Sequence, residues 1–342
     1  MSLVVEPISG GLEDVFHISP FKLRESYQQC SAYTKSSMMY RGQAYKDNDI
    51  ANKCESFVVK LDDMLVFLFL GVNSAQKEKN IVNGYVGRSC VLFFNSDLIS
   101  KKSLQAMLRG IDKIINKDNV EFVYRDFLIG GNLSPLSKYL LSIGASIKQC
   151  FTQVIDLEQS EKTIRKNIRK RYSSFINWGL RELTLTINNK SSNFSWSEMQ
   201  AFQKLHFKVS GRNTRTEESW RRQYEMCLTG EAFVVMAEFD GELVSAGFFT
   251  NSHDSCYYGA SASRRDLFKK PIFHALLWTA IMHAKLIGCK WFEVGEQVYT
   301  NINQASEKES GISKFKAGFG GTTKAFLDIT LKQKRLKCPI QK

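Results

Sequence analysis

The fold of this chain is decided by residues 231–297, which read EAFVVMAEFDGELVSAGFFTNSHDSCYYGASASRRDLFKKPIFHALLWTAIMHAKLIGCKWFEVGEQ. Two apolar runs, 233–237 and 243–249, flank the pair Asp240-Gly241. This dipeptide between apolar runs is typical of a two-residue β-hairpin turn. The first part of the stretch therefore predicts two antiparallel strands joined by a tight turn.

The second part of the stretch predicts a strand, a helix and another strand. Residues 256–261 read as a third short strand. Pro271 begins an apolar helix, because proline is favoured at a first helical position. Gly288 stands where a left-handed C-terminal cap is expected, and residues 290–294 then read as a buried strand. A further helix with a glycine-rich end and a last strand complete an order that few folds have.

The bulk properties are those of a globular chain with a basic surface. Its 342 residues are enough for two domains, and 43% of them are hydrophobic. No apolar run approaches the roughly 20 residues that span a bilayer, and the N-terminus lacks the features of a signal peptide. Eight scattered cysteines without a C-x-x-C pair favour a reducing cytoplasm over disulfides or a zinc site. The net charge of +13 favours phosphate-bearing ligands, although a soluble protein can also be basic without such a ligand.

The N-terminal half repeats the same order of elements. Its expected helices cover about 20–48, 103–117 and 134–143, and its expected strands cover 55–59, 64–72, 83–94, 120–124 and 147–157. The second of these helices is the clearest, because its apolar residues recur at helical spacing. We therefore expect an α/β (α+β) chain of two tandem domains, 1–157 and 158–342, each with a mixed central sheet covered by helices.

A basic segment follows the expected junction between the domains. Six of the ten residues from Lys162 to Arg171 are lysine or arginine, and Ser160 before an acidic residue is a fair helix start. The segment is either a solvated linker helix or a clamp for a phosphate backbone or a phosphorylated substrate. Charge alone does not decide between these two interpretations.

A set of short motifs is spread over residues 152–332. They are VIDL at 154–157, IRK at 168–170, INWG at 176–179, GRNTR at 211–215 with Trp220, YYGAS at 257–261, HALLW at 274–278, FEVGE at 292–296 and FKAGFGG at 315–321. Together they resemble the FemAB-like branch of the GNAT-fold acyltransferases. The set is fairly specific for that superfamily and unspecific for the substrate.

The resemblance implies two tandem GNAT-like domains, the first of them degenerate and serving as a scaffold or binding the acceptor. The implied activity is transfer of an acyl group from an acyl-CoA donor to an amine of a small molecule, a nucleotide-sugar or a surface-glycan precursor. Two alternatives stay open: a Fem-type ligase that uses aminoacyl-tRNA, and a non-catalytic RNA-binding module. Peripheral contact with the inner membrane is also left open, whereas a metal and DNA are not expected.

One departure from the GNAT pattern bears on the donor. In enzymes of this fold that use acetyl-CoA, a glycine-containing turn before the central helix presents backbone N–H groups to the pyrophosphate. The corresponding residues, 263–271 (SRRDLFKKP), contain no glycine, but they are rich in basic side chains. The residues expected to bind coenzyme A are therefore Ser261, Arg264, Arg265, Lys269 and Lys270.

Acyl transfer to an amine requires deprotonation of the amine, stabilisation of the carbonyl oxygen and protonation of the leaving group. No G-x-S-x-G motif is present, so direct attack in a ternary complex is expected. The resemblance implies that Lys316 stabilises the carbonyl oxygen, although the helix dipole also favours a surface lysine there. Glu293 and Glu296 are candidate bases or structural carboxylates. Tyr258 is a candidate acid and Tyr257 a candidate substrate ligand, although tyrosines are also ordinary strand residues.

Arginines are the candidates for binding the acceptor. Arg212 and Arg215 lie in a polar loop between two expected helices, where guanidinium groups bind phosphate or carboxylate in a bidentate manner or else face solvent. Arg169, in the basic segment, is the third candidate. His274 and His283 are nine residues apart on one helix and face roughly opposite sides, so they are not expected to share a metal.

Overall fold

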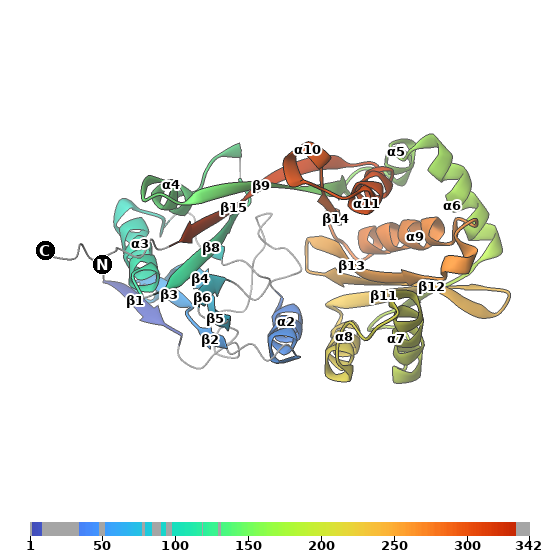
Figure 1. Ribbon diagram of the computed structural model, residues 1–342, viewed down its shortest axis with the longest axis horizontal. Coiled ribbons are helices and arrows are strands. Elements are labelled where there is room, and N and C mark those ends of the chain that lie inside the picture. The colour runs from blue at the N-terminus through green and yellow to red at the C-terminus, as the bar shows by residue number, and fades with distance from the viewer. Residues whose placement is uncertain are drawn as a thin grey trace, which may run out of the picture. The chain divides into compact units, whose positions relative to one another are not determined.

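The computed structural model describes residues 2–8, 34–47, 52–76, 79–83, 90–93, 98–117, 119–128 and 131–332 (Figure 1). Its internal contacts divide the chain into two compact units. The first unit takes its described residues from 1–28, 48–149 and 326–342, and the second unit takes them from 29–47 and 150–325. Because the candidate site residues all lie in the second unit, that unit is described first.

The sheet of the second unit has the strand order β10-β11-β12-β13-β14-β9. Its strands are β9 (Ser146–Asp156), β10 (Thr184–Asn188), β11 (Ala232–Phe239), β12 (Glu242–Asn251), β13 (Ser255–Ser263) and β14 (Trp291–Gln297). Neighbouring strands are antiparallel except β13 and β14, which run parallel. The predicted hairpin between β11 and β12 is confirmed, since Asp240 and Gly241 both have positive φ, 51° and 75°, as a type I′ turn requires.

Helices cover both faces of this sheet (Figure 1). They are α2 (Lys35–Asp47), α5 (Glu161–Lys166), α6 (Lys170–Glu182), α7 (Trp196–Ser210), α8 (Glu217–Thr229), α9 (Ile272–Leu286), α10 (Thr300–Asn303) and α11 (Glu307–Ala317). Successive side chains of a strand point to opposite faces of the sheet, and they therefore belong to two different core clusters. Phe233 and Val235 of β11 pack in the cluster with α6 and α9, whereas Val234 and Met236 pack in the cluster with α7 and α8. The mixed sheet between two helical layers agrees with the predicted fold class.

The central helix α9 forms close to where the sequence predicts it. Pro271, predicted at the first helical position, is instead the N-cap residue, and the helix begins one residue later at Ile272. Gly288 has a φ of 93° and follows the C-cap residue Ile287, which confirms the predicted left-handed end of the helix. Within the described part of the chain, no helix combines the length and the apolar character that crossing a bilayer requires.

The basic segment forms two helices instead of one. Ser160 caps α5 by accepting a hydrogen bond from the backbone N–H of Thr163, so the predicted helix start is confirmed. The helix ends at Lys166, and α6 begins at Lys170. The N–H of Arg169 between them donates to the carbonyl of Gly318, a tertiary bond that competes with helix continuation.

The first unit contains two sheets. The first sheet has the strand order β1-β3-β4-β7, and its strands are β1 (Leu3–Pro7), β3 (Phe57–Leu61), β4 (Met64–Leu70) and β7 (Cys90–Phe93). The second sheet includes strands in the order β15-β8-β6-β5-β2. These strands are β2 (Asn52–Cys54), β5 (Val72–Gln76), β6 (Lys79–Asn83), β8 (Val120–Asp126) and β15 (Thr322–Lys332). The unit also contains α3 (Lys101–Ile115) and α4 (Pro135–Ser142). The single strand expected at 83–94 is instead the end of β6 and the separate strand β7, with 84–89 outside the described residues. Of the helix expected at 20–48, only 34–47 are described.

The two units differ from a simple division at residue 157. Strand β15 leaves the second unit at Phe326, because its later residues pair with β8. Helix α2 belongs to the second unit, because it packs on α8, and the backbone N–H of Ser36 donates to the Glu231 carboxylate at 2.9 Å. The second unit is therefore assembled from separate pieces of the sequence.

Candidate active site

The sheet of the second unit opens between β13 and β14. The two strands pair only where Ser255–Tyr257 meets Trp291–Glu293. Just beyond, the register of β13 against β12 shifts at a β-bulge that leaves Gly259 without a partner on β12. The register of β14 against β9 shifts at the same level, between Glu293 and Gly295. Side chains near these bulges therefore line an opening between two strands.

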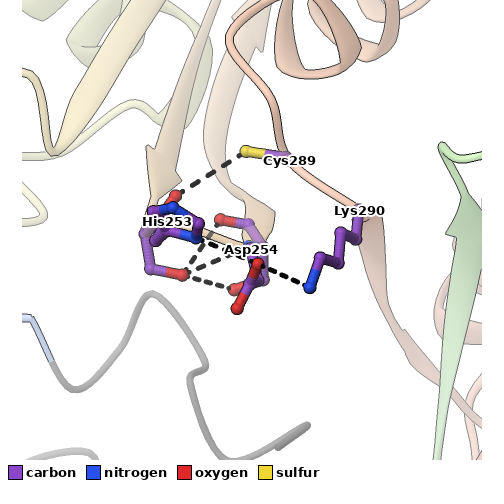
Figure 2. Close-up of polar contacts among 6 residues, drawn as sticks. His253, Asp254, Cys289 and Lys290 are labelled. Atoms are coloured by element: carbon purple, nitrogen blue, oxygen red, sulfur yellow. Dashed lines mark hydrogen bonds and ion pairs between the residues drawn. The ribbon is translucent and has the colours of Figure 1, made fainter. Parts of the chain in front are cut away.

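A buried charged group holds the other end of this strand pair together (Figure 2). The carboxylate of Asp254, only 3% exposed, lies 3.2 Å from Lys290 Nζ and 3.0 Å from His253 Nδ1. The Asp254 carbonyl accepts a hydrogen bond from the Lys290 backbone N–H at 2.8 Å. Burial, with Asp254 nearby, raises the pKa of Cys289 to about 12, so that thiol stays protonated. The group fixes the start of β13 and β14, so the strands separate only after Tyr257.

Lys316 reaches the opening from the last turn of α11. Its ammonium nitrogen lies 2.9 Å from the position that a Cβ atom on Gly295 would occupy, and the φ of 106° at this residue favours glycine. The ring of Tyr257 borders the same position at 3.8 Å. Burial lowers the pKa of Lys316, and the charges of Glu296 and Glu293 partly oppose this shift. The ammonium makes no hydrogen bond or ion pair with any residue that the structure describes.

The two predicted bases both act electrostatically on Lys316, but they differ in their surroundings. Glu293 is half-buried, and the Thr152 hydroxyl donates to its Oε1 atom at 2.7 Å. Glu296 is exposed. The structure thus brings Lys316 and both glutamates into one group, with one carboxylate fixed by a neighbour and the other open to solvent.

The two predicted tyrosines have different environments. Tyr257 is half-buried and borders Gly295 beside the Lys316 ammonium. Tyr258 packs against Phe249 and Phe273, and its hydroxyl contacts the hydroxyl of Ser261. Burial raises the pKa of Tyr258 to about 12. Of the two, Tyr257, the expected substrate ligand, therefore lies beside Lys316, whereas Tyr258, the expected acid, packs among aromatic side chains.

An aromatic cluster surrounds His274 near the start of α9. The ring centroids of Tyr172, Phe175 and Phe315 lie 4.5, 4.9 and 5.3 Å from that of the imidazole. Burial lowers the pKa of His274 to about 4, so the imidazole is neutral at pH 7. The cluster anchors Phe315 and thereby the turn of α11 that carries Lys316. The sequence analysis missed this supporting group, although Phe315 and Phe319 stand at helical spacing.

The loop expected to bind coenzyme A is closed by its own hydrogen bonds. The backbone N–H groups of Leu267, Phe268, Lys270 and Ile272 donate to carbonyls of residues 264–270, at 2.8–3.3 Å. A pyrophosphate cradle needs N–H groups that point outward without partners. These four amides are therefore not available to the pyrophosphate of coenzyme A.

The predicted coenzyme A side chains are also partly occupied. The Arg264 guanidinium binds the carboxylates of Glu242 and Asp266. The Lys270 ammonium lies 4.9 Å from the centroid of the Phe239 ring. Arg265 and Lys269 are exposed, whereas Ser261 faces Tyr258. The loop consequently presents two exposed cations rather than a cradle.

The predicted acceptor arginines are unlike each other. Arg212 is exposed, whereas Arg215 is half-buried. The Arg215 guanidinium lies 4.6 Å from the Trp220 ring centroid and donates a hydrogen bond to Gln223 at 2.9 Å. Burial lowers the pKa of Arg215; nearby Arg41 acts in the same direction. No carboxylate among the described residues forms an ion pair with Arg215. This cation therefore lacks the anionic partner that a buried charge normally has.

Arg169 and its neighbour Arg165 serve the structure of the second unit. Arg169 donates to the Lys314 carbonyl at 3.1 Å and to the Tyr172 hydroxyl at 3.3 Å. Arg165 donates to Asn177 at 2.6 Å and lies 4.8 Å from the Trp278 ring centroid. Both guanidinium groups are therefore engaged in contacts within the unit, although Arg169 is also exposed to solvent. Over the described residues, no cluster of His, Cys, Asp and Glu is arranged to hold a metal ion.

Comparison with known proteins links this geometry to a fold. No family model and no curated protein matches the sequence. Among solved structures, FemX is similar with a TM-score of 0.64 and 11% identity, over 84% of this chain and 90% of FemX. L-PGS from Bacillus licheniformis is similar with a TM-score of 0.59 and 13% identity, over 97% and 94% of the two chains.

A third similar structure is a tandem GNAT protein from the clavulanic acid biosynthesis pathway, with a TM-score of 0.52 and 11% identity, over 97% of this chain and 98% of that one. At these identities the likeness establishes the fold and leaves the substrate open. The similarity covers 84–97% of this chain in the three cases, so it includes both of its units. The chain therefore has the fold of FemX and of the tandem GNAT protein.

Proposed function

We propose that the second unit transfers an acyl or aminoacyl group to a primary amine, and that the amine attacks the carbonyl directly. The observation that carries the proposal is the position of Lys316. Its half-buried ammonium lies against Gly295 and Tyr257, where β13 and β14 separate, and near two carboxylates. A fixed positive charge in a site partly shielded from water stabilises a developing oxyanion.

The proposed reaction uses four side chains. The amine nitrogen forms a bond to the carbonyl carbon, while the bond from that carbon to the leaving oxygen or sulfur breaks. Lys316 stabilises the negative charge on the carbonyl oxygen, and the exposed Glu296 accepts the proton from the amine. Glu293, held by Thr152, keeps Lys316 charged, and the Tyr257 hydroxyl donates a proton to the leaving group.

The closed β13–α9 loop bears on the donor. The fold is shared with acyl-CoA enzymes, but four N–H groups of this loop donate to carbonyl oxygens of the same loop and are not free to bind a phosphate. An acyl-CoA donor would have to be bound by side chains such as Arg265 and Lys269. Aminoacyl-tRNA needs no such cradle, so this observation favours an aminoacyl donor as the second candidate.

Arg215 bears on the acceptor. Its half-buried guanidinium has one hydrogen bond, to Gln223, and no carboxylate partner among the residues described. A phosphate or carboxylate on the acceptor would supply the missing charge in a bidentate contact. We therefore expect the amine to be part of an anionic molecule, such as a nucleotide-sugar or another glycan precursor.

The test offers purified protein both donor classes, a charged tRNA pool and a set of acyl-CoAs, with anionic and neutral amines, and detects the N-acyl product by mass spectrometry. Lys316→Ala should lose the product, whereas Lys314→Ala, an exposed lysine of the same helix, should keep it. Arg215→Gln should raise KM for anionic amines and leave neutral ones unchanged. Absence of product above the Lys316→Ala level with every donor would overturn the proposal.

A further inference from the structure

The β13–α9 loop presents a large aromatic side chain to solvent between basic residues. Phe268 is 67% exposed, although its neighbour Leu267 packs on the core cluster beneath α6 and α9. Arg265, Lys269 and Lys270 flank Phe268 in the sequence and are exposed. The transfer reaction proposed above uses no part of the Phe268 ring.

The loop holds Phe268 outward in a fixed conformation. A short 3₁₀ helix, Arg265–Leu267, precedes it, and the Phe268 N–H donates to the Arg265 carbonyl at 3.2 Å. Arg264 ties the base of the loop to Glu242 of β12 and to Asp266. Because the loop is already ordered, presenting the ring to a partner requires little further loss of conformational freedom.

Charge around the ring selects the kind of partner. Glu242 and Asp266 are occupied by Arg264, whereas Arg265 and Lys269 form no ion pair with the described residues. Lys208 of α7 also acts electrostatically on Asp266. An exposed aromatic ring among lysines and arginines matches the interface of an anionic bilayer, where rings enter the headgroup region and cations meet lipid phosphates.

We propose that residues 264–270 dock the second unit on an anionic membrane surface, with Phe268 inserted between the lipid headgroups. The proposal goes beyond the transfer reaction and does not depend on it, because membrane binding is measured without turnover. It also gives a role to a loop in which four amides are not available to a pyrophosphate. An RNA surface is the competing interpretation of an aromatic ring between cations.

The experiment is flotation of the full chain with phosphatidylcholine vesicles and with vesicles rich in phosphatidylglycerol. Binding should be confined to the anionic vesicles and should weaken as salt increases. Lys269→Ser should lower the partition coefficient about fivefold, which corresponds to about 1 kcal/mol per basic residue near the surface. Phe268→Ser should lower it at least as much, because the inserted ring contributes apolar area.

Leu286→Ser is the matched control, since Leu286 is 82% exposed at the opposite end of α9. It should leave the partition coefficient unchanged. Equal binding to both vesicle types, or equal effects of Phe268→Ser and Leu286→Ser, would overturn the proposal. So would a lack of vesicle binding together with binding of a tRNA pool that Phe268→Ser weakens, since the loop would then be an RNA surface.

Discussion

Two opposing effects act on the ammonium of Lys316. Burial disfavours the charged form, and the charges of Glu296 and Glu293 favour it; the net result is a lowered pKa. In the proposed reaction, the two glutamates therefore help Lys316 to keep the charge that stabilises the carbonyl oxygen.

The first prediction concerns pH. We expect the transfer rate to fall at alkaline pH as Lys316 loses its proton below the ordinary lysine pKa of 10.5. Between the lowered pKa and 10.5 the unfolded chain binds more protons than the folded one, so the free energy of unfolding should rise with pH across that window. A pH profile of kcat and a series of thermal melts measure the two effects. An alkaline limb that stays in place in Lys316→Arg would contradict the assignment, since arginine does not titrate there.

The second prediction separates the catalytic from the structural contribution of this residue. Lys316→Met should lower kcat by about 10²–10³-fold, the range seen when one oxyanion donor is removed. Its Tm should stay the same or rise, because methionine removes a partly buried charge. Steady-state kinetics and calorimetry of Lys316→Met and Lys314→Met measure both quantities. A parallel loss of Tm and kcat in Lys316→Met would instead make Lys316 a structural residue.

At the scale of elements, the third prediction concerns two glycines of α11 and of the turn that follows it. A Cβ atom on Gly318 would lie 2.3–2.9 Å from ring atoms of Tyr172, whereas one on Gly311 would meet nothing within 4 Å. Gly318→Ala should therefore destabilise the fold by about 1–3 kcal/mol through overpacking. Gly311→Ala, in the middle of α11, should stabilise it by about 0.5–1 kcal/mol. Urea unfolding of the pair tests this, and a neutral Gly318→Ala would show that Tyr172 can move aside.

Elements whose residues interact locally could be predicted from the sequence, and those set by distant contacts could not. The Asp240-Gly241 hairpin and the end of α9 at Gly288 depend on backbone preferences of one or two residues, and both are confirmed. The break between α5 and α6 depends on Gly318, far along the chain, which accepts the Arg169 N–H. Likewise, the sequence did not predict which of Tyr257 and Tyr258 lies beside Lys316, because that arrangement joins β13, β14 and α11, which are distant in the sequence.

At the scale of the whole molecule, the chain crosses between its two units several times. Strands β9 and β15 each begin in one unit and end in the other, and α2 belongs to the second unit although it lies in the N-terminal sequence. A sequence pattern that is read element by element favours one boundary at the end of β9, near residue 157. The contacts place the later part of β9 with β14, in the second unit.

The fourth prediction follows from this arrangement and concerns fragments of the chain that are divided after residue 157. A fragment of residues 158–342 lacks β9, whose residues Phe151–Asp156 pair with Trp291–Gln297 of β14. It would expose β14 as an unpaired edge beside the buried Phe292 and would remove the Thr152 hydroxyl from Glu293. We expect this fragment to aggregate or to unfold without a cooperative transition. Fragments 1–157 and 158–342 expressed together should associate and recover the melt of the intact chain, because the first carries both β9 and α2. A monomeric 158–342 with a cooperative thermal transition would show that the second unit folds without them.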